Sequence, residues 1–169
     1  MDIDIIIPIY NAFDFVKKCI ETVIEHTDLT QHTLLLVNDK STDERILPLL
    51  NSFIKENQSL NIILIDNKDN QGFVRTVNIG MQYSHHDVVL LNSDTEVTRN
   101  WLSKIQNCAY SKPAVATVTP LSNNATLASV PVFLAENTIP PGLSVEEYAD
   151  IVEKCSMNLF PDIPTAHGF

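Results

Sequence analysis

Glycine is scarce in this chain, with four residues among 169. Glycine-rich loops that cradle phosphates need several glycines close together, and the sequence contains no G-x-G-x-x-G pattern. The chain also lacks an apolar run of the ~18 residues that a membrane-spanning helix requires. These absences argue against dinucleotide-binding oxidoreductases and other phosphate-loop enzymes, and they predict no transmembrane segment.

Basic residues are also few, with 11 Lys and Arg against 21 Asp and Glu and a formal charge of −10. Nucleic acids and acidic membranes attract basic patches, so we expect no nucleic-acid partner. Cys19, Cys108 and Cys155 are widely spaced, as is typical of reduced thiols. Because no cationic leader precedes the first apolar run, the sequence predicts a cytoplasmic protein, with loose association at the inner face of a membrane left open.

Short apolar runs alternate with helical patterns through the first part of the chain. Continuous apolar runs are typical of strands buried on both faces of a parallel sheet. They occupy residues 3–9, 34–37, 62–65 and 88–91, and a fifth strand is expected at 114–118. Apolar residues at helical spacing follow Phe13, Asp43, Phe73 and Trp101. The alternation predicts an α/β fold with a mainly parallel sheet flanked by helices.

The last part of the chain has a different character. Residues 119–142 are rich in Pro, Ser, Asn and Thr, which predicts a long irregular segment. Ser144 and Glu147 have the spacing of a capping box that opens a helix. We therefore expect an α/β core over residues 1–118 and a separate region over 119–169, truncated before a further strand.

Polar side chains follow the predicted strands, where open α/β sheets bind their ligands. Tyr10 and Asn11 follow the first strand, Asp39 the second and Asp94 the fourth. Tyr10 can stack on a planar base, and Asp39 can accept a hydrogen bond from its N–H. Asp94 can ligate a hard cation such as Mg²⁺ or Mn²⁺ between two phosphates.

Each of these residues also has a purely structural interpretation. Asp39 can cap the helix that follows it, and Asn11 can be an ordinary turn residue. Tyr10 can pack against the fold, and Arg75 can lie in solvent on its helix. Asp94 is the residue most suggestive of function, because a carboxylate beside a buried strand is costly without a partner.

Four segments occur in a specific order: IIPIYN at 6–11, VNDKSTD at 37–43, NQGFVRTVNIG at 70–80 and LLNSDTEV at 90–97. Together they resemble the family 2 glycosyltransferases, and the resemblance covers residues 3–118. PLSNNAT at 120–126 is similar to the bacterial polysaccharide and O-antigen branch of that family. The resemblance implies the GT-A fold, an α/β domain that binds a nucleotide-diphospho-sugar. It makes residues 1–118 the donor-binding core and 119–169 the start of the acceptor-side region.

The resemblance also implies roles for individual residues. Pro8 and Tyr10 match the loop that lines the base, and Asp39 matches the aspartate that holds the base or ribose. Arg75 lies on the helix that borders the donor site, and Asp94 matches the last aspartate of the metal-binding D-x-D motif. The expected donor-binding residues are Pro8, Tyr10, Asn11, Asp39, Arg75, Asn92, Ser93 and Asp94, with the metal on Asp94.

Three positions depart from the family pattern. Asn38 stands where the family often has Asp, and Lys40 where it often has Gly. Asn92 replaces the first Asp of D-x-D, so the metal site lacks one negative charge. We expect weaker metal affinity as a result, with either Mn²⁺ or Mg²⁺ as the divalent cation.

The expected function is transfer of a sugar, with inversion and metal assistance, from a nucleotide-diphospho-sugar to a glycan, a lipid-linked acceptor or another hydroxyl. Such a reaction needs a general base. The resemblance implies that this base lies beyond Phe169, and none is assigned to Glu136, Glu146 or Glu147. The alternative is a donor-binding module, or a catalytically incomplete fragment, without turnover. A sugar nucleotidyltransferase fits less well, since no basic glycine-rich loop follows the first strand.

Overall fold

The computed structural model describes residues 2–125, 127–157 and 159–164. It divides into two compact units, Met1–Glu96 and Val97–Phe169. The donor-binding core expected over residues 1–118 thus runs past the end of the first unit, and that functional division stays a prediction. The helices of the described residues include none that is long and apolar enough to cross a membrane.

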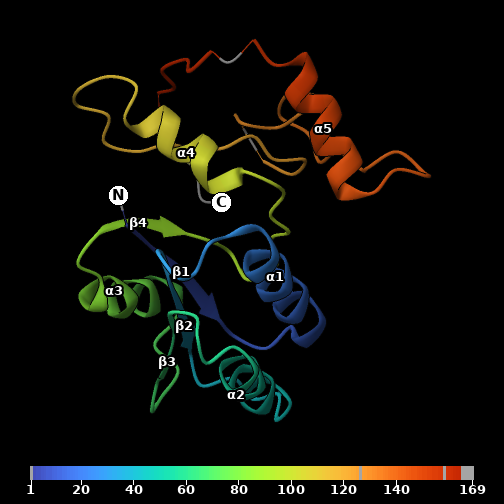
Figure 1. Cartoon of the computed structure of the whole chain (residues 1–169). Helices are drawn as coiled ribbons and strands as arrows, with labels where there is room; N and C mark the ends of the chain where they lie inside the picture. Colours follow the sequence, from blue (N-terminus) through green and yellow to red (C-terminus); the bar gives the residue numbers. More distant parts are fainter. Residues whose placement is uncertain (1, 126, 158, 165–169) are drawn as a thin grey trace. The chain divides into compact units, whose positions relative to one another are not determined.

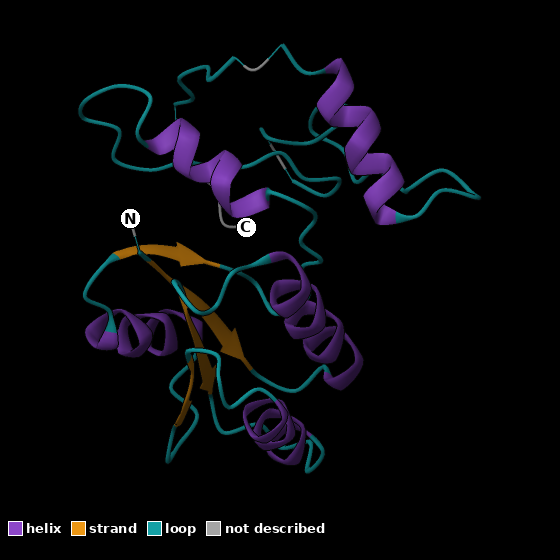
Figure 2. Cartoon of the chain, in the orientation of Figure 1, coloured by secondary structure: helices purple, strands orange, loops and turns teal. Residues whose placement is uncertain are grey.

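The first unit is an α/β layer structure whose four strands are all parallel, in the order β3-β2-β1-β4. Figure 1 shows α1 and α2 on one side of this sheet and α3 on the other, and Figure 2 shows the strands alone in orange. The α/β fold with a parallel sheet is therefore confirmed. Its elements are β1 Ile3–Ile9, α1 Phe13–His26, β2 Thr33–Asn38, α2 Ile46–Glu56, β3 Ile62–Asp66, α3 Phe73–Tyr83 and β4 Asp87–Leu90.

The core of this unit lies on the two central strands. Ile5, Ile6 and Ile7 of β1 are all fully buried, as expected for a strand covered on both faces. Under α3, Ile6 packs with Leu35 and Val37 of β2. Gly80 brings α3 close to β1, because a Cβ at that position would lie 2.7 Å from Cγ2 of Ile6. The sheet is thus a rigid platform for the loops that leave its ends.

The described residues of the second unit form two helices, α4 Trp101–Ala109 and α5 Val145–Cys155. The capping box predicted at the start of α5 is confirmed, since the Ser144 hydroxyl accepts from the Glu147 N–H and the Glu147 carboxylate accepts from the Ser144 N–H. The strand predicted at 114–118 is wrong, because these residues form no strand. Ala114 has a left-handed φ of 65°, which breaks an extended run, and Pro113 before it has no N–H to donate.

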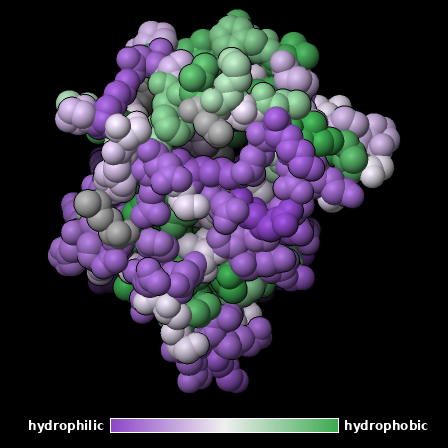
Figure 3. Space-filling model, turned by 45° about the horizontal axis from the view of Figure 1, so that its top comes forward, coloured by the Kyte–Doolittle hydropathy of each residue, from purple (hydrophilic) through white to green (hydrophobic). Residues whose placement is uncertain are grey.

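Apolar side chains are less well buried in the second unit. No residue of α5 is buried, and several large apolar side chains lie exposed, among them Leu121, Val132, Phe133, Leu134, Met157 and Leu159. Figure 3 shows hydrophobic residues gathered at the upper edge of the face in view and hydrophilic residues over much of the rest. The densely packed core of the chain is therefore that of the first unit.

Candidate functional site

The loops that follow the four strands leave the sheet at one edge. Hydrogen bonds between neighbouring strands continue to this edge, from Asp39 N to Ile9 O (2.8 Å) and from Asn67 N to Asn38 O (2.9 Å). On the other side of β1, Leu91 N donates to Ile6 O (2.9 Å). We call the residues beyond these bonds the polar rim: residues 10–11, 38–43, 66–72 and 92–94. The rim gathers all the predicted donor-binding residues except Pro8 and Arg75, which lie on β1 and α3.

Asp39 is a buried carboxylate of the rim, and it is 4% exposed. Its Oδ1 accepts hydrogen bonds from Gln71 N (2.8 Å) and Asn67 Nδ2 (2.9 Å), and its Oδ2 accepts one from Gly72 N (2.8 Å). Burial alone would raise the pKa of Asp39. The hydrogen bonds from Gln71, Asn67, Thr76 and Gly72 outweigh that effect and hold the pKa below its ordinary value. Asp39 is therefore a carboxylate at neutral pH.

The same contacts place the Asp39 carboxylate directly before α3. This helix begins at Phe73 after Gly72, with no side-chain cap and no acidic residue in its first turn. Asp39 bonds to Gln71 N and Gly72 N, which precede the helix, and places a negative charge from another loop at the positive end of the helix. The alternative that Asp39 caps the helix directly after it is wrong, because its carboxylate bonds to the start of α3 instead.

Asn67 was not among the predicted site residues, yet the structure places it beside Asp39. It is 8% exposed, and besides Asp39 its amide contacts Thr76 Oγ1, at 3.4 Å. The available signal was its position directly after an apolar strand, in line with Asp39 and Asn11. Nothing local distinguished it from an ordinary turn residue.

Asn38 stands where the family often has Asp, and its contacts explain the difference. Its Nδ2 donates to Asp66 Oδ1 (2.7 Å), and its Oδ1 accepts from Ser41 N (3.2 Å). A carboxylate at position 38 would face that of Asp66 without a hydrogen to share at neutral pH. The amide thus joins the ends of β2 and β3, and it is 3% exposed.

Asn11 holds the loop after β2. It has a left-handed φ of 60°, and its Oδ1 accepts from Thr42 N (2.8 Å) and Asp43 N (2.9 Å). Its own N–H donates to Ser41 Oγ (2.9 Å). The structure therefore gives Asn11 the role of a turn residue, and contact with a donor through its Nδ2 stays a prediction.

Tyr10 and Arg75 differ from these buried groups in being exposed. Tyr10 is 49% exposed at the end of β1, and Arg75 lies on the first turn of α3. Among the described residues, no hydrogen bond or ion pair engages the Tyr10 hydroxyl or the Arg75 guanidinium. Pro8 is partly exposed within β1. These side chains are free to meet a ligand, and their contacts with one stay predictions.

The loop after β4 carries the candidate metal residue. The Asn92 carbonyl accepts from Thr95 N (3.2 Å) and from the Cys19 thiol of α1 (3.5 Å). Burial raises the pKa of Cys19 to about 12, so the thiol keeps its hydrogen. Asn92 and Asp94 are exposed, and Ser93 is half-buried. The cost of a buried carboxylate therefore does not apply to Asp94, contrary to our expectation.

The described residues contain no group of three His, Cys, Asp or Glu side chains that could hold a metal ion alone. The Asp94 carboxylate forms no hydrogen bond or ion pair with any of the described residues. In the same loop, Oε2 of Glu96 lies 3.9 Å from Nζ of Lys18. Mg²⁺ and Mn²⁺ commonly bind through one or two carboxylates together with substrate phosphates. The exposed Asp94 carboxylate fits a cation that arrives with its substrate.

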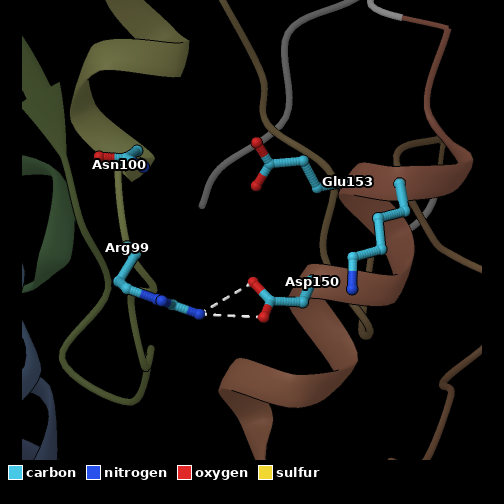
Figure 4. Close-up of a pocket in the computed structure, with 5 residues that line it drawn as sticks. Arg99, Asn100, Asp150 and Glu153 are labelled. Carbon is cyan, nitrogen blue, oxygen red and sulfur yellow. Dashed lines mark hydrogen bonds and ion pairs between the residues drawn. The ribbon is translucent and has the colours of Figure 1, made fainter.

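A polar pocket occurs in the second unit, and Figure 4 shows its lining side chains. Arg99 points to Asp150 and bonds to both carboxylate oxygens (3.1 and 3.0 Å), and its Nε bonds to Glu146 (3.1 Å). Asn100, Glu153 and Lys154 complete the lining. The Arg99 guanidinium is thus paired with the carboxylates of α5. The residues that line this pocket include none of the predicted donor-binding residues.

Comparison with known proteins identifies the fold and family. Residues 4–142 match the family model described as Glycosyl transferase family 2. The chain belongs to this family. It is similar in structure to a mannosyltransferase from Pyrobaculum calidifontis in complex with GDP-Man and Mn²⁺, with a TM-score of 0.65, 17% identity and coverage of 70% of this chain and 35% of the other. A structure of S. aureus TarS in complex with UDP-GlcNAc gives a TM-score of 0.56 at 17% identity, over 75% and 41% of the two chains. The expected GT-A fold is confirmed.

Curated relatives match over shorter segments. Polypeptide N-acetylgalactosaminyltransferase 11 of Xenopus tropicalis is 31% identical over 104 residues, which are 60% of this chain and 17% of the relative. Poly(ribitol-phosphate) beta-glucosyltransferase of Bacillus spizizenii is 33% identical over 73 residues, 43% of this chain and 11% of the relative. The chain therefore spans less than a fifth of the length of these two relatives.

Proposed function

We propose that this chain binds a nucleotide-diphospho-sugar at the polar rim and supplies the donor half of a glycosyltransferase. The observation that carries the proposal is the convergence of Tyr10, Asp39 and Asp94 on one edge of a parallel sheet, in a chain of glycosyl transferase family 2. Ligands of open α/β sheets bind at this edge. The solved neighbours with GDP-Man and UDP-GlcNAc support a donor of this class.

The exposed and the buried groups of the rim have different roles in donor binding. The Tyr10 ring offers a face on which a base can stack. Asp39, a carboxylate held in place by Gln71 and Gly72, accepts a hydrogen bond from the base or ribose. The Arg75 guanidinium on α3 provides positive charge near the donor. Asn11, Asn92, Ser93 and Pro8 complete the donor-binding set.

Asp94 would hold the divalent cation, Mn²⁺ or Mg²⁺, that accompanies the donor. When bound, such a cation would supply stabilisation of the negative charge that develops on the leaving diphosphate. The Cys19 bond to the Asn92 carbonyl orients the loop that presents Asp94. Complexes of solved neighbours with Mn²⁺ support this assignment.

Inversion requires a general base that takes the proton of the acceptor hydroxyl. We assign none within the chain, because Glu146 is bonded to Arg99 and Glu147 to the start of α5. The acceptor we propose is a glycan or a lipid-linked hydroxyl of a bacterial polysaccharide. The Bacillus spizizenii relative, a poly(ribitol-phosphate) glucosyltransferase by name, supports this class. The cytoplasmic location stays a prediction.

Calorimetric titration of the chain with UDP, GDP and dTDP, each with and without Mn²⁺, tests the proposal. We expect one nucleotide to bind, and to bind more tightly with Mn²⁺. Asp94→Asn should remove the effect of Mn²⁺, while Glu96→Gln in the same loop should keep it. Failure of the folded chain to bind any of the three nucleotides would show the proposal to be wrong.

The second candidate is a donor-binding module without turnover. It is favoured by the share of the relatives that the chain spans, 17% and 11% for the two named above. The module binds the same nucleotide with the same dependence on Mn²⁺. It differs in releasing no free sugar and transferring none when the chain is incubated with the matching nucleotide-sugar and a hydroxyl acceptor.

A further inference from the structure

Asn67 joins three elements of the rim while remaining buried. Its backbone N–H donates to the carbonyl of Asn38 at the end of β2 (2.9 Å). Its side-chain amide donates to Asp39 Oδ1 (2.9 Å) and contacts Thr76 Oγ1 on α3 (3.4 Å). Both hydrogens of this amide are thus directed at groups of the chain, and none is left for a ligand.

The hydrogen bonds around Asp39 are distributed unequally between its two oxygens. A carboxylate oxygen has two acceptor positions, and both of those on Oδ1 are taken, by Gln71 N and Asn67 Nδ2. Oδ2 has one fixed donor, Gly72 N. The Thr76 hydroxyl also lowers the pKa of Asp39, but it is a rotor whose hydrogen can turn elsewhere. The acceptor position without a fixed donor therefore lies on Oδ2.

We propose that Asn67 is a positioning residue of the donor site, which holds Oδ1 of Asp39 so that Oδ2 is the atom that accepts a hydrogen bond from the nucleotide. This inference rests on the proposed function, in which Asp39 contacts the base or ribose. Without the Asn67 amide, Gln71 N and Gly72 N would still hold the carboxylate, but Oδ1 would have a vacant acceptor position, and the nucleotide could bond to either oxygen. Fixing one orientation before binding reduces the entropy that the complex must lose.

Replacement of Asn67 by Asp tests the role of the amide hydrogen with almost no change of shape. In Asn67→Asp, two carboxylates lie side by side, and above neutral pH they repel each other. As the pH falls, the pair takes up one shared proton, and position 67 can again donate to Asp39. A positioning role therefore predicts that nucleotide binding is lost at high pH and regained on acidification.

The experiment measures nucleotide affinity against pH by calorimetry, using whichever of UDP, GDP or dTDP the unmodified chain binds with Mn²⁺. The terminal phosphate of the nucleotide titrates at about pH 6, so each variant is compared with the unmodified chain, in which Asp39 is ionised throughout, at every pH between about 6 and about 8. Asn67→Asp should bind about tenfold more weakly at the upper end, and this deficit should shrink toward the lower end. Asn61→Asp, the same change near the opposite end of β3, should behave like the unmodified chain.

Asn67→Ser provides a second variant in case two carboxylates prevent folding. Its hydroxyl is too short to reach Asp39, so it should weaken binding at every pH without recovery on acidification. Circular dichroism and thermal unfolding establish that each variant is folded. Unchanged affinity at high pH in folded Asn67→Asp, or throughout in folded Asn67→Ser, would overturn the inference. If the unmodified chain and Asn61→Asp bind none of the three nucleotides, the proposed function itself is wrong.

Discussion

The side-chain amide of Asn38 donates a hydrogen bond to Oδ1 of Asp66, with 2.7 Å between the two atoms. This bond joins the ends of β2 and β3, next to the loops that carry Asp39 and Asn67. A hydrogen bond of this kind has a direction, because the amide donates and the carboxylate accepts. This direction explains why position 38 is Asn in this chain, where the family often has Asp.

Asn38→Asp should destabilise the first unit by about 1–2 kcal/mol near neutral pH, because two carboxylates then face each other without a hydrogen between them. The double variant Asn38→Asp with Asp66→Asn restores the bond with its direction reversed. We expect it to recover most of the lost stability in urea unfolding. Additive effects of the two changes would contradict this account of the pair.

Gly80→Ala should destabilise the chain by about 1–3 kcal/mol, because the added methyl group has no space between α3 and β1. The nearest atom, Ile6 Cγ2, would lie 2.7 Å away, and Ile6 is fully buried. Gly72→Ala is the informative comparison, since its Cβ would meet nothing within 4 Å but its φ is +76°. The Gly72 variant should lose about 1–3 kcal/mol from backbone strain alone, because its ψ of 162° places it in a region that is essentially restricted to glycine. Urea unfolding measures both, and equal stability of Gly80→Ala and the unmodified chain would contradict the packing argument.

Acid should weaken the first unit through Asp39. Its pKa lies below the ordinary value in the folded chain, so the stabilisation is fully present above the unfolded pKa of about 4 and is lost as the pH falls through the lower folded value. Asp39→Asn should lower stability at pH 7 and flatten its decline in acid. Urea unfolding between about pH 3 and pH 7 tests this sign. If the free energy of unfolding of the variant falls as steeply in acid as that of the unmodified chain, other groups cause the acid destabilisation.

The three thiols should react with an alkylating or disulfide reagent at very different rates. Cys155 is exposed, while Cys19 is fully buried with a pKa raised to about 12. Because the thiolate is the reactive form, Cys19 should react only after unfolding, and Cys155 should react first in the folded chain. Cys155→Ser should remove the fast phase. Rapid labelling of Cys19 in the folded chain would show that α1 does not protect it.

Much of the first unit could be predicted from the sequence, because its strands are continuous apolar runs and its helices have a regular apolar face. The start of α5 could be predicted equally well, because the capping box involves only Ser144 and Glu147, which are three positions apart in the sequence. The strand expected at 114–118 failed for a local reason as well: Ala114 takes a left-handed φ of 65°. A short apolar run does not reveal that conformation.

The partners of the rim residues could not be read in the same way. Asp39 bonds to the start of α3, 32 and 33 residues later in the chain, and Asn67 joins it from the end of β3. Such contacts depend on the order of strands in the sheet, which a polar residue after an apolar run does not specify. The sequence placed Asp39 correctly at the rim, but it suggested a contact with α2 instead of one with the residues directly before α3.

The bonds from Gln71 and Gly72 to Asp39 have a spectroscopic consequence. Both amide hydrogens point at a titrating carboxylate rather than at a carbonyl, so their nuclear magnetic resonance frequencies should follow its charge. Two backbone signals, 32 and 33 positions away in the chain, would then report the ionisation of Asp39 directly. The same two signals would register any group that comes to share this carboxylate.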